Sequence, residues 1–239
     1  MVKEAVTIND RITVTGNVHL ILADNAKLQA KQGIDVSKGN SLTIYAQRDM
    51  VTENTGKIEA EINGKNAGIG GSENKEGGII KITGGKVKVK SKNGAGIGGG
   101  YEGAGGNIEI TGGDVIATSM YGAGIGGGRG GAGGSIKITG GKVYASSAPD
   151  GGAGIGAGEG GAAGNFSTGP DGKATIKANR GISDTSNEEN WKGIIFQNKR
   201  GKVYGEQELS YDFDIGVGHI LEIPSGGKLT IPVSKTLDI

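Results

Sequence analysis

The stretch GAGIGGG at Gly94–Gly100 carries the strongest fold signal in the chain, because near-copies of it recur at nearly constant spacing. The alanines of the other copies are Ala67, Ala123 and Ala153. The first two gaps between consecutive alanines are 28 residues and the third is 30. A fixed period of this size is typical of a stacked array, in which each unit contacts only its neighbours. The sequence therefore predicts a rod with long faces.

Each of the first three copies is followed by two short alternating segments separated by Thr-Gly-Gly. In IKITGGKVKVK at Ile80–Lys90, alternation at period two places Ile80, Ile82, Val87 and Val89 on one side of two strands. The Gly pair between them is a turn, where a positive φ costs Gly nothing. The equivalent apolar residues of the other units are Ile108, Ile110, Val115, Ala117, Ile136, Ile138, Val143 and Ala145, and the Gly phrases add Ile69, Ile97, Ile125 and Ile155.

These features predict an all-β fold, a single elongated parallel β-helix (solenoid) with about three short strands per coil and central 28-residue repeats. Successive coils are expected ~4.8 Å apart. The crossover rule for parallel strands favours a right-handed coil. Ile, Val and Ala suit the narrow interior.

Charged residues in the repeats give an independent test of the register. Lys81, Glu109 and Lys137 are 28 residues apart and would stack vertically, with alternating sign. A second column with alternating sign consists of Lys86, Asp114 and Lys142. Each exposed pair contributes only ~0–1 kcal/mol, so the columns indicate register rather than stability.

The whole chain, 1–239, is expected to form one β-helix domain. We expect irregular N-terminal coils over 1–60, the Gly-rich repeats over 61–165 and irregular C-terminal coils over 166–239. Strand-like alternation is still running at the last residues, from which we expect the chain to be cut from a longer one.

Composition excludes several classes of function. The net charge of +1 lacks the basic excess that phosphate neutralisation needs, so no nucleic-acid partner is expected. No apolar run approaches 18 residues, so no membrane insertion is expected. The chain has no Cys, which removes thiol chemistry.

The phrases Gly94–Gly100 and Ile110–Val115 resemble repeats in large cell-surface proteins of Gram-positive gut and oral bacteria. The lead-in Asn40–Tyr45 and the tail segment Leu221–Gly226 also resemble the flanks of such repeats. The resemblance implies a secreted or wall-attached parent with a β-helical region. Such proteins are often labelled carbohydrate-binding or adhesin-like, so the resemblance implies an extracellular, cell-surface or cell-wall location. It supplies no catalytic or ligand residue.

Candidate binding residues are the aromatic and charged side chains at the corners of the repeat, since sugar faces stack on aromatic rings. Tyr101, Arg129 and Glu159 occupy equivalent corners, Tyr121 precedes a Gly phrase, and Tyr144 points outward from a strand. Variation at one corner of a fixed repeat is typical of a binding ridge. An unconstrained solvent corner would look the same.

The sequence evidence for a catalytic function is weaker than that for binding. The Gly phrases are similar to the Gly-rich motif that binds phosphate in dinucleotide-binding proteins. Such a site has a single copy of the motif followed by a helix, whereas this chain has four copies and no helical pattern after them. A β-helical polysaccharide lyase or hydrolase could use Asp114 with Lys86 and Lys142, or Glu109 with Lys81 and Lys137, although the stacking columns also explain these residues. Asp184, Glu188 and Glu189 match no known calcium loop. We therefore expect no catalytic residue, no metal and no cofactor.

Three functions remain open. The first is a non-catalytic extracellular binding or adhesion module that recognises glycans, with a host, dietary or cell-wall polysaccharide as partner. The second is a structural spacer of a surface protein, and the third is a polysaccharide lyase or hydrolase. In each case we expect a monomer.

Overall fold

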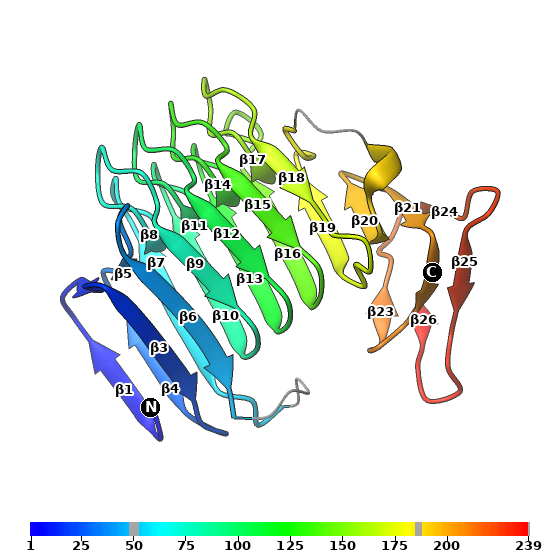
Figure 1. Cartoon of the computed structure of the whole chain (residues 1–239), viewed down its shortest axis with the longest axis horizontal. Helices are drawn as coiled ribbons and strands as arrows, with labels where there is room; N and C mark the ends of the chain where they lie inside the picture. The colour runs from blue at the N-terminus through cyan, green and yellow to red at the C-terminus, as the bar shows by residue number, and fades with distance from the viewer. Residues whose placement is uncertain (48–52, 185–187, 239) are drawn as a thin grey trace.

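The chain winds into a stack of coils whose strands form three long sheets and, near the C-terminus, two further two-stranded sheets. The fold is that of a computed structural model, in which residues 1–47, 53–184 and 188–238 are described. The first coil consists of β1 (Ala5–Ile8), β2 (Ile12–Thr13) and β3 (Asn17–Leu22). Figure 1 shows the later coils following it side by side along the long axis, with the two termini at opposite ends. The predicted all-β parallel β-helix with three strands per coil is confirmed.

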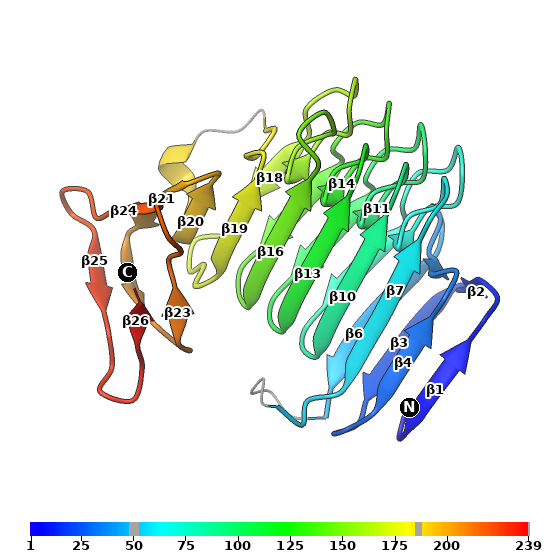
Figure 2. The ribbon, with the colours of Figure 1, turned by 180° about the vertical axis from the view of Figure 1, so that it is seen from behind.

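Sheet I is the longest sheet and has ten strands in the order β1-β4-β7-β10-β13-β16-β19-β20-β21-β24. Figure 2 shows its strands from behind. After β1 its strands are β4 (Lys27–Ala30), β7 (Lys57–Ile62), β10 (Lys86–Ser91), β13 (Asp114–Ser119), β16 (Lys142–Ser147), β19 (Thr175–Asn179), β20 (Gly193–Gln197), β21 (Arg200–Tyr204) and β24 (Ile220–Glu222).

Sheets II and III have six strands each and complete the coils. Sheet II consists of β2 and the two-residue strands β5 (Ile34–Asp35), β8 (Ile69–Gly70), β11 (Ile97–Gly98), β14 (Ile125–Gly126) and β17 (Ile155–Gly156). Sheet III consists of β3, β6 (Ser41–Ala46), β9 (Ile79–Ile82), β12 (Asn107–Ile110), β15 (Ser135–Ile138) and β18 (Asn165–Ser167).

The interior is built from the predicted apolar residues. Every interior position expected from the repeats is buried, with at most 2% of its surface exposed. Equivalent residues of successive coils lie directly over one another, as in the pairs Ile108↔Ile136 and Ile97↔Ile125. Burying apolar surface contributes about 25 cal/mol per Å², so this continuous row of aliphatic side chains is the main stabilising feature of the rod.

The charge columns also have the predicted register. In the strand register, Glu109 lies opposite Lys81 on one neighbouring strand and opposite Lys137 on the other. Asp114 likewise lies opposite Lys86 and Lys142 in the strand register. The Nζ of Lys81 lies 3.0 Å from Oε2 of Glu109, so Lys81 and Glu109 form an ion pair between neighbouring coils. The hand of the coil stays a prediction.

The Gly phrases form sheet II because their backbones must approach closely. Gly98 and Gly126 have φ values of +133° and +135°, where an L side chain is strained. Each is stacked against the Gly of the next coil, Gly126 and Gly156 respectively. A Cβ on either residue would overlap with the carbonyl oxygen of that Gly. The Gly row is therefore a requirement of coil stacking.

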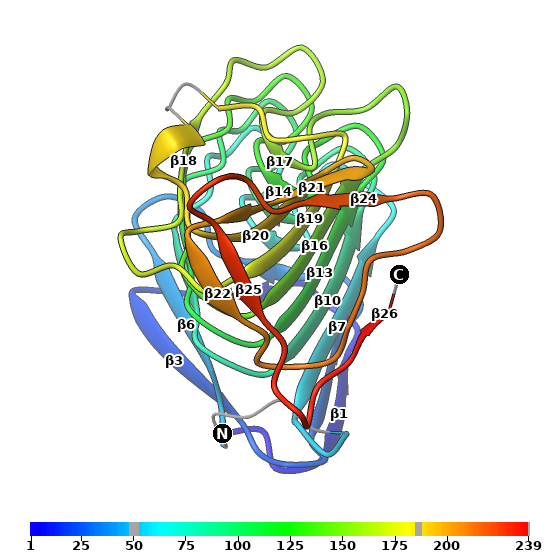
Figure 3. The same ribbon diagram turned by 90° about the vertical axis from the view of Figure 1, so that its right-hand side faces the viewer.

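The predicted continuous spiral is interrupted near the C-terminus. β21 runs antiparallel to β20, from which it is separated by the two-residue loop Asn198-Lys199. Such a short loop can only reverse the chain, because parallel neighbours need a long crossover. Two further coils follow: β21, β22 (Glu206–Glu208) and β23 (Phe213–Asp214), then β24, β25 (Lys228–Thr230) and β26 (Leu237–Asp238), which pair in parallel. Figure 3 views this end of the molecule along the rod.

The reversed coils have a core of their own. Ile195 of β20 belongs to the main core, whereas its neighbours Ile194 and Phe196 belong to a second cluster with Phe213. This second cluster therefore lies on the other face of β20. Trp191 lies just before β20, is 3% exposed and meets the Phe166 ring edge-on at 5.0 Å, so it packs at the end of the main coil stack.

A partly buried Arg ties the first coil to the first Gly phrase. The guanidinium of Arg11 donates hydrogen bonds to the carbonyl oxygens of Gln32 (2.8 Å), Ala67 (3.0 Å) and Gly70 (3.0 Å). Its Nε donates to Oγ of Ser72 at 3.2 Å. Ser72 in turn donates to Oδ2 of Asp35 at 2.7 Å, so a charged network joins three coils.

We expect acid to weaken this anchor through Asp35. Burial alone would raise the pKa of its carboxyl, but hydrogen bonds from Ser37 and Ser72 and the charge of Arg11 outweigh it and hold the pKa below its usual 3.8. A lowered folded-state pKa contributes stability that is complete above the unfolded pKa and is lost as pH falls through the folded value. Urea unfolding should therefore show Asp35→Asn less stable than wild type at neutral pH, with the gap closing below pH 3.8. A gap independent of pH would contradict this role.

Candidate functional site

Four of the five predicted binding residues lie along one strip of Gly-rich loops. Successive corners are joined by backbone hydrogen bonds, since Asn74 donates to the carbonyl of Tyr101 (2.8 Å) and Glu102 to that of Arg129 (2.7 Å). Gly130 donates in the same way to the carbonyl of Glu159 at 2.8 Å. The predicted corner column of Tyr101, Arg129 and Glu159 therefore exists, and Tyr121 lies beside it.

Side chains of this strip interact mostly with one another. Arg129 lies over the ring of Tyr121, with 4.9 Å from its Cζ to the ring centroid. The same Arg pairs through Nε with Oε2 of Glu159 at 3.0 Å. Lys65 lies over the ring of Tyr101 at 5.1 Å and also forms an ion pair with Glu73. Cross-coil pairing therefore accounts for the residue types at these corners, and one face of each Tyr ring carries a cation.

Tyr144 lies elsewhere, on the outer face of sheet I. It is 38% exposed and stands between Ile116 and Lys177 of the neighbouring strands. The five candidates therefore do not form one site. Their role in binding stays a prediction.

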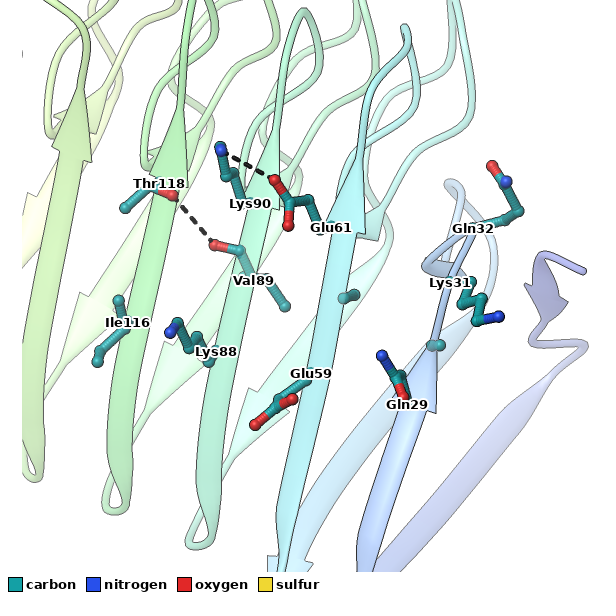
Figure 4. A pocket seen from close by; sticks show the side chains of 12 residues that line it. Gln29, Lys31, Gln32, Glu59, Glu61, Lys88, Val89, Lys90, Ile116 and Thr118 are labelled. Atoms are coloured by element: carbon teal, nitrogen blue, oxygen red, sulfur yellow. Dashed lines mark hydrogen bonds and ion pairs between the residues drawn. The ribbon is translucent and has the colours of Figure 1, made fainter. Parts of the chain in front are cut away.

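A first groove, the face groove, crosses the outer face of sheet I over β4, β7, β10 and β13 and has a volume of about 640 Å³. Figure 4 shows Glu59, Lys88 and Lys90 on its walls, with Lys90 reaching Glu61. Nζ of Lys90 lies 2.9 Å from Oε1 of Glu61, and Lys27 pairs with Glu59. These ion pairs between coils account for Glu59, Glu61 and Lys90 in the lining of the face groove.

A second groove, the turn-row groove, lies where the Thr-Gly-Gly turns meet the reversed C-terminal coils. Its volume is about 700 Å³. One wall repeats over consecutive coils and consists of Lys86, Thr111–Asp114 and Thr139–Lys142. The opposite side is provided by Ser210, Tyr211 and Lys235, and Glu53, Asp171 and Lys173 complete the lining. Two distant parts of the chain therefore build this groove.

Tyr211 fixes the C-terminal wall to the turns. Its hydroxyl donates a hydrogen bond to the carbonyl oxygen of Gly141 at 2.7 Å. Burial raises the pKa of this hydroxyl, hydrogen bonding at Thr175 opposes the shift, and the charge of Asp114 adds to it. The hydroxyl is thus neutral at physiological pH and remains a hydrogen-bond donor.

The sequence prediction missed the C-terminal half of this groove. Lys86, Asp114 and Lys142 were identified as a charge column, but Tyr211 and Lys235 carry no local signal that brings them to the turns. Only the chain reversal after β20 does so. The Asn198-Lys199 loop is the one trace of that reversal in the sequence, since Asn tolerates the positive φ of 57° found at Asn198.

The acidic residues considered for calcium have other partners. Oδ1 of Asp184 accepts a hydrogen bond from the backbone N–H of Phe166 at 2.7 Å. The carboxylate of Glu188 accepts hydrogen bonds from Gln197 (2.8 Å) and Tyr204 (3.0 Å). Among residues 1–47, 53–184 and 188–238, no cluster of three or more His, Asp or Glu side chains is arranged to hold a metal ion.

Three segments of the chain match the family model for a beta helix repeat, at residues 80–101, 108–129 and 136–159. Each match begins at the strand of sheet III and extends through the next Gly phrase, so the β-helical repeat region is confirmed. Comparison with curated proteins and with solved structures gave no significant match. In the described part of the chain, no helix is long and apolar enough to cross a membrane.

Proposed function

We propose that this chain is a non-catalytic polysaccharide-binding module and that the turn-row groove holds the ligand. The observation that carries the proposal is the repeating lining of the groove. Thr111–Asp114 and Thr139–Lys142 present the same turn on two consecutive coils, ~4.8 Å apart. A groove with a repeating wall suits a polymer of repeating units.

The chemistry of the lining also suits sugars. Thr111, Thr139 and Ser210 provide hydroxyl groups, and the Gly turns between them bring the backbone to the surface of the groove. Tyr211 adds an aromatic ring, and ligand sites commonly combine such an apolar surface with a few placed polar groups. The resemblance of the Gly phrases to repeats of Gram-positive surface proteins supports an extracellular adhesion role.

A polysaccharide lyase or hydrolase is the second candidate. One observation favours it: Asp114 and Asp171 share the groove with Lys86 and Lys142, which brings carboxylates and bases together. Acid–base cleavage of a glycosidic bond requires such groups on either side of the bond. Incubation with polysaccharides followed by chromatography of the products decides between the two candidates. Accumulation of shorter chains would contradict the non-catalytic proposal.

We expect binding to depend on free space in the turn-row groove. Thr111→Gln adds an uncharged, longer side chain at an exposed position and should weaken polysaccharide binding by about tenfold, ~1.4 kcal/mol. Thr43→Gln makes the same change on β6 of sheet III, away from the groove, and should leave binding unchanged. A glycan array followed by calorimetry with the polysaccharides that bind measures both variants. If wild type binds no glycan on the array, the chain is better regarded as a spacer.

A further inference from the structure

The outward row at the N-terminal ends of the sheet I strands is unusually rich in lysine. Its register runs Lys27↔Lys57↔Lys86↔Asp114↔Lys142 over consecutive coils. Like charges directly opposite each other on neighbouring strands destabilise a sheet. Charge alternation between coils therefore accounts for Lys86, Asp114 and Lys142 but not for the adjacent lysines Lys27 and Lys57.

The lysines of the row differ in their partners. Lys27 and Lys57 share Glu59, with Nζ of Lys57 3.9 Å from its Oε1. Within the described residues, Lys86 and Lys142 form no ion pair, although Asp114 lies on the strand between them. These two lysines are the members of the row that line the turn-row groove.

Two more lysines converge on the same groove from other elements. Lys173 precedes β19, and Lys235 lies on the reversed C-terminal coils. Neither forms an ion pair in the part of the chain that the structure describes. Elsewhere on the rod, Lys81 and Lys90 are paired with a carboxylate, whereas Lys88 and Lys137 form no ion pair in the described part of the chain. The lining of the turn-row groove therefore holds four lysines and three carboxylates, which are Glu53, Asp114 and Asp171.

The spacing of these charges constrains the ligand. Lys86 and Lys142 are two coils apart, a separation of ~10 Å along the rod. The carboxylate of Asp114 lies between them and would repel an anion but accept hydrogen bonds from sugar hydroxyls. The wall therefore presents positive, negative and positive groups in sequence. A matching polymer carries an anionic group, then a neutral hydroxyl-bearing unit, then a second anionic group.

We propose that the ligand of the turn-row groove is a linear acidic polysaccharide in which anionic and neutral sugars alternate. This inference rests on the proposed function. Lys86 and Lys142 bind successive anionic groups, Asp114 accepts hydrogen bonds from the neutral sugar between them, and Lys173 and Lys235 contribute positive charge.

Calorimetric titration with four polymers tests this proposal. The probes are hyaluronan, in which uronate alternates with a neutral sugar, unsulfated chondroitin of the same pattern, polygalacturonate, in which every sugar is charged, and neutral dextran. We expect the two alternating polymers to bind more tightly than the other two, and added salt to weaken their binding because ions screen exposed charges. Duplex DNA serves as a polyanion without sugar hydroxyls in this pattern and should bind more weakly than hyaluronan.

Variants locate the binding charges. Lys86→Gln and Lys142→Gln should each weaken hyaluronan binding roughly three- to tenfold, as expected for one partly exposed charge contact. Lys88→Gln is the matched control, because Lys88 lies on the same strand and face as Lys86 but outside the turn-row groove. An equal loss with Lys88→Gln would overturn the location of the site.

The remaining outcomes separate this inference from the proposed function. Binding of dextran as tight as that of hyaluronan overturns the acidic ligand while polysaccharide binding stands. Equally tight binding of polygalacturonate or DNA overturns the alternating pattern. If no polysaccharide binds, on the array or in titration, both proposals are wrong.

Discussion

Ile110→Asp should unfold the central coils. The side chain of Ile110 is fully buried, and it stacks between Ile82 and Ile138 of the neighbouring coils. An aspartate there would place a carboxylate in an aliphatic interior that offers it no compensating charge, at a cost of more than ~4 kcal/mol. Since whole domains are stable by only ~5–15 kcal/mol, the loss is a large fraction of the total. Circular dichroism during thermal and urea unfolding measures it.

The control for this prediction is Ile79→Asp. Ile79 lies on β9 of the same sheet, but 55% of its surface is exposed. The same chemical change should therefore alter stability by no more than ~0.5 kcal/mol there, as is usual for surface substitutions. Equal unfolding midpoints for both variants would show that Ile110 does not face the interior.

Gly126→Ala should be nearly as damaging, although it adds only one methyl group. The residue has a φ of +135°, which strains any L side chain, and the new Cβ would overlap with the carbonyl oxygen of Gly156. The carbonyl cannot move away freely, because the backbone N–H of Gly127 donates a hydrogen bond to it at 2.9 Å. We expect a loss of ~3–5 kcal/mol, the range of severe overpacking and strain, measured as a shift of the urea midpoint.

Two other glycines separate the steric effect from the conformational one. Gly160 has a positive φ of +75° but no atom near its missing Cβ, so Gly160→Ala should cost only the strain of ~1 kcal/mol. Gly64 has neither a positive φ nor a near neighbour, and Gly64→Ala should leave stability unchanged within ~0.5 kcal/mol. If Gly126→Ala were as mild as Gly64→Ala, the close approach of the coils in sheet II would be contradicted.

The repeat region was predictable because a single local rule applies to each coil. Alternation alone identifies Ile108 and Ile110 as interior, and the 28-residue period alone stacks Glu109 on Lys81 and Lys137. Coils contact only their neighbours, so no long-range information is needed. The same reasoning identified the Thr-Gly-Gly turns, whose second Gly has a φ of +91° at Gly85 and Gly113.

The candidate site was predictable only in part, since it depends on contacts outside the repeat. The hydrogen bond from Tyr211 to Gly141 joins residues 70 positions apart, and no periodic pattern relates them. The sequence predicted equivalent corners for Tyr101, Arg129 and Glu159, but it did not predict which side chains would pair. Arg129, for example, contacts both Tyr121 and Glu159, and these three residues belong to three different loops of the stack. Sequence patterns predict where a residue lies along a coil, but they say little about which side chains contact one another.

The position of Trp191 determines what an optical experiment on this protein reports. It is the only tryptophan in the chain, and it lies at the end of the coil stack against Phe166 and Tyr204. The repeats themselves have an aliphatic interior, so their melting leaves indole emission unaffected unless it spreads to that end. Fluorescence therefore follows the C-terminal end, whereas far-ultraviolet dichroism follows the whole rod. Non-coincident traces from the two signals would be the signature of fraying that starts at the other terminus.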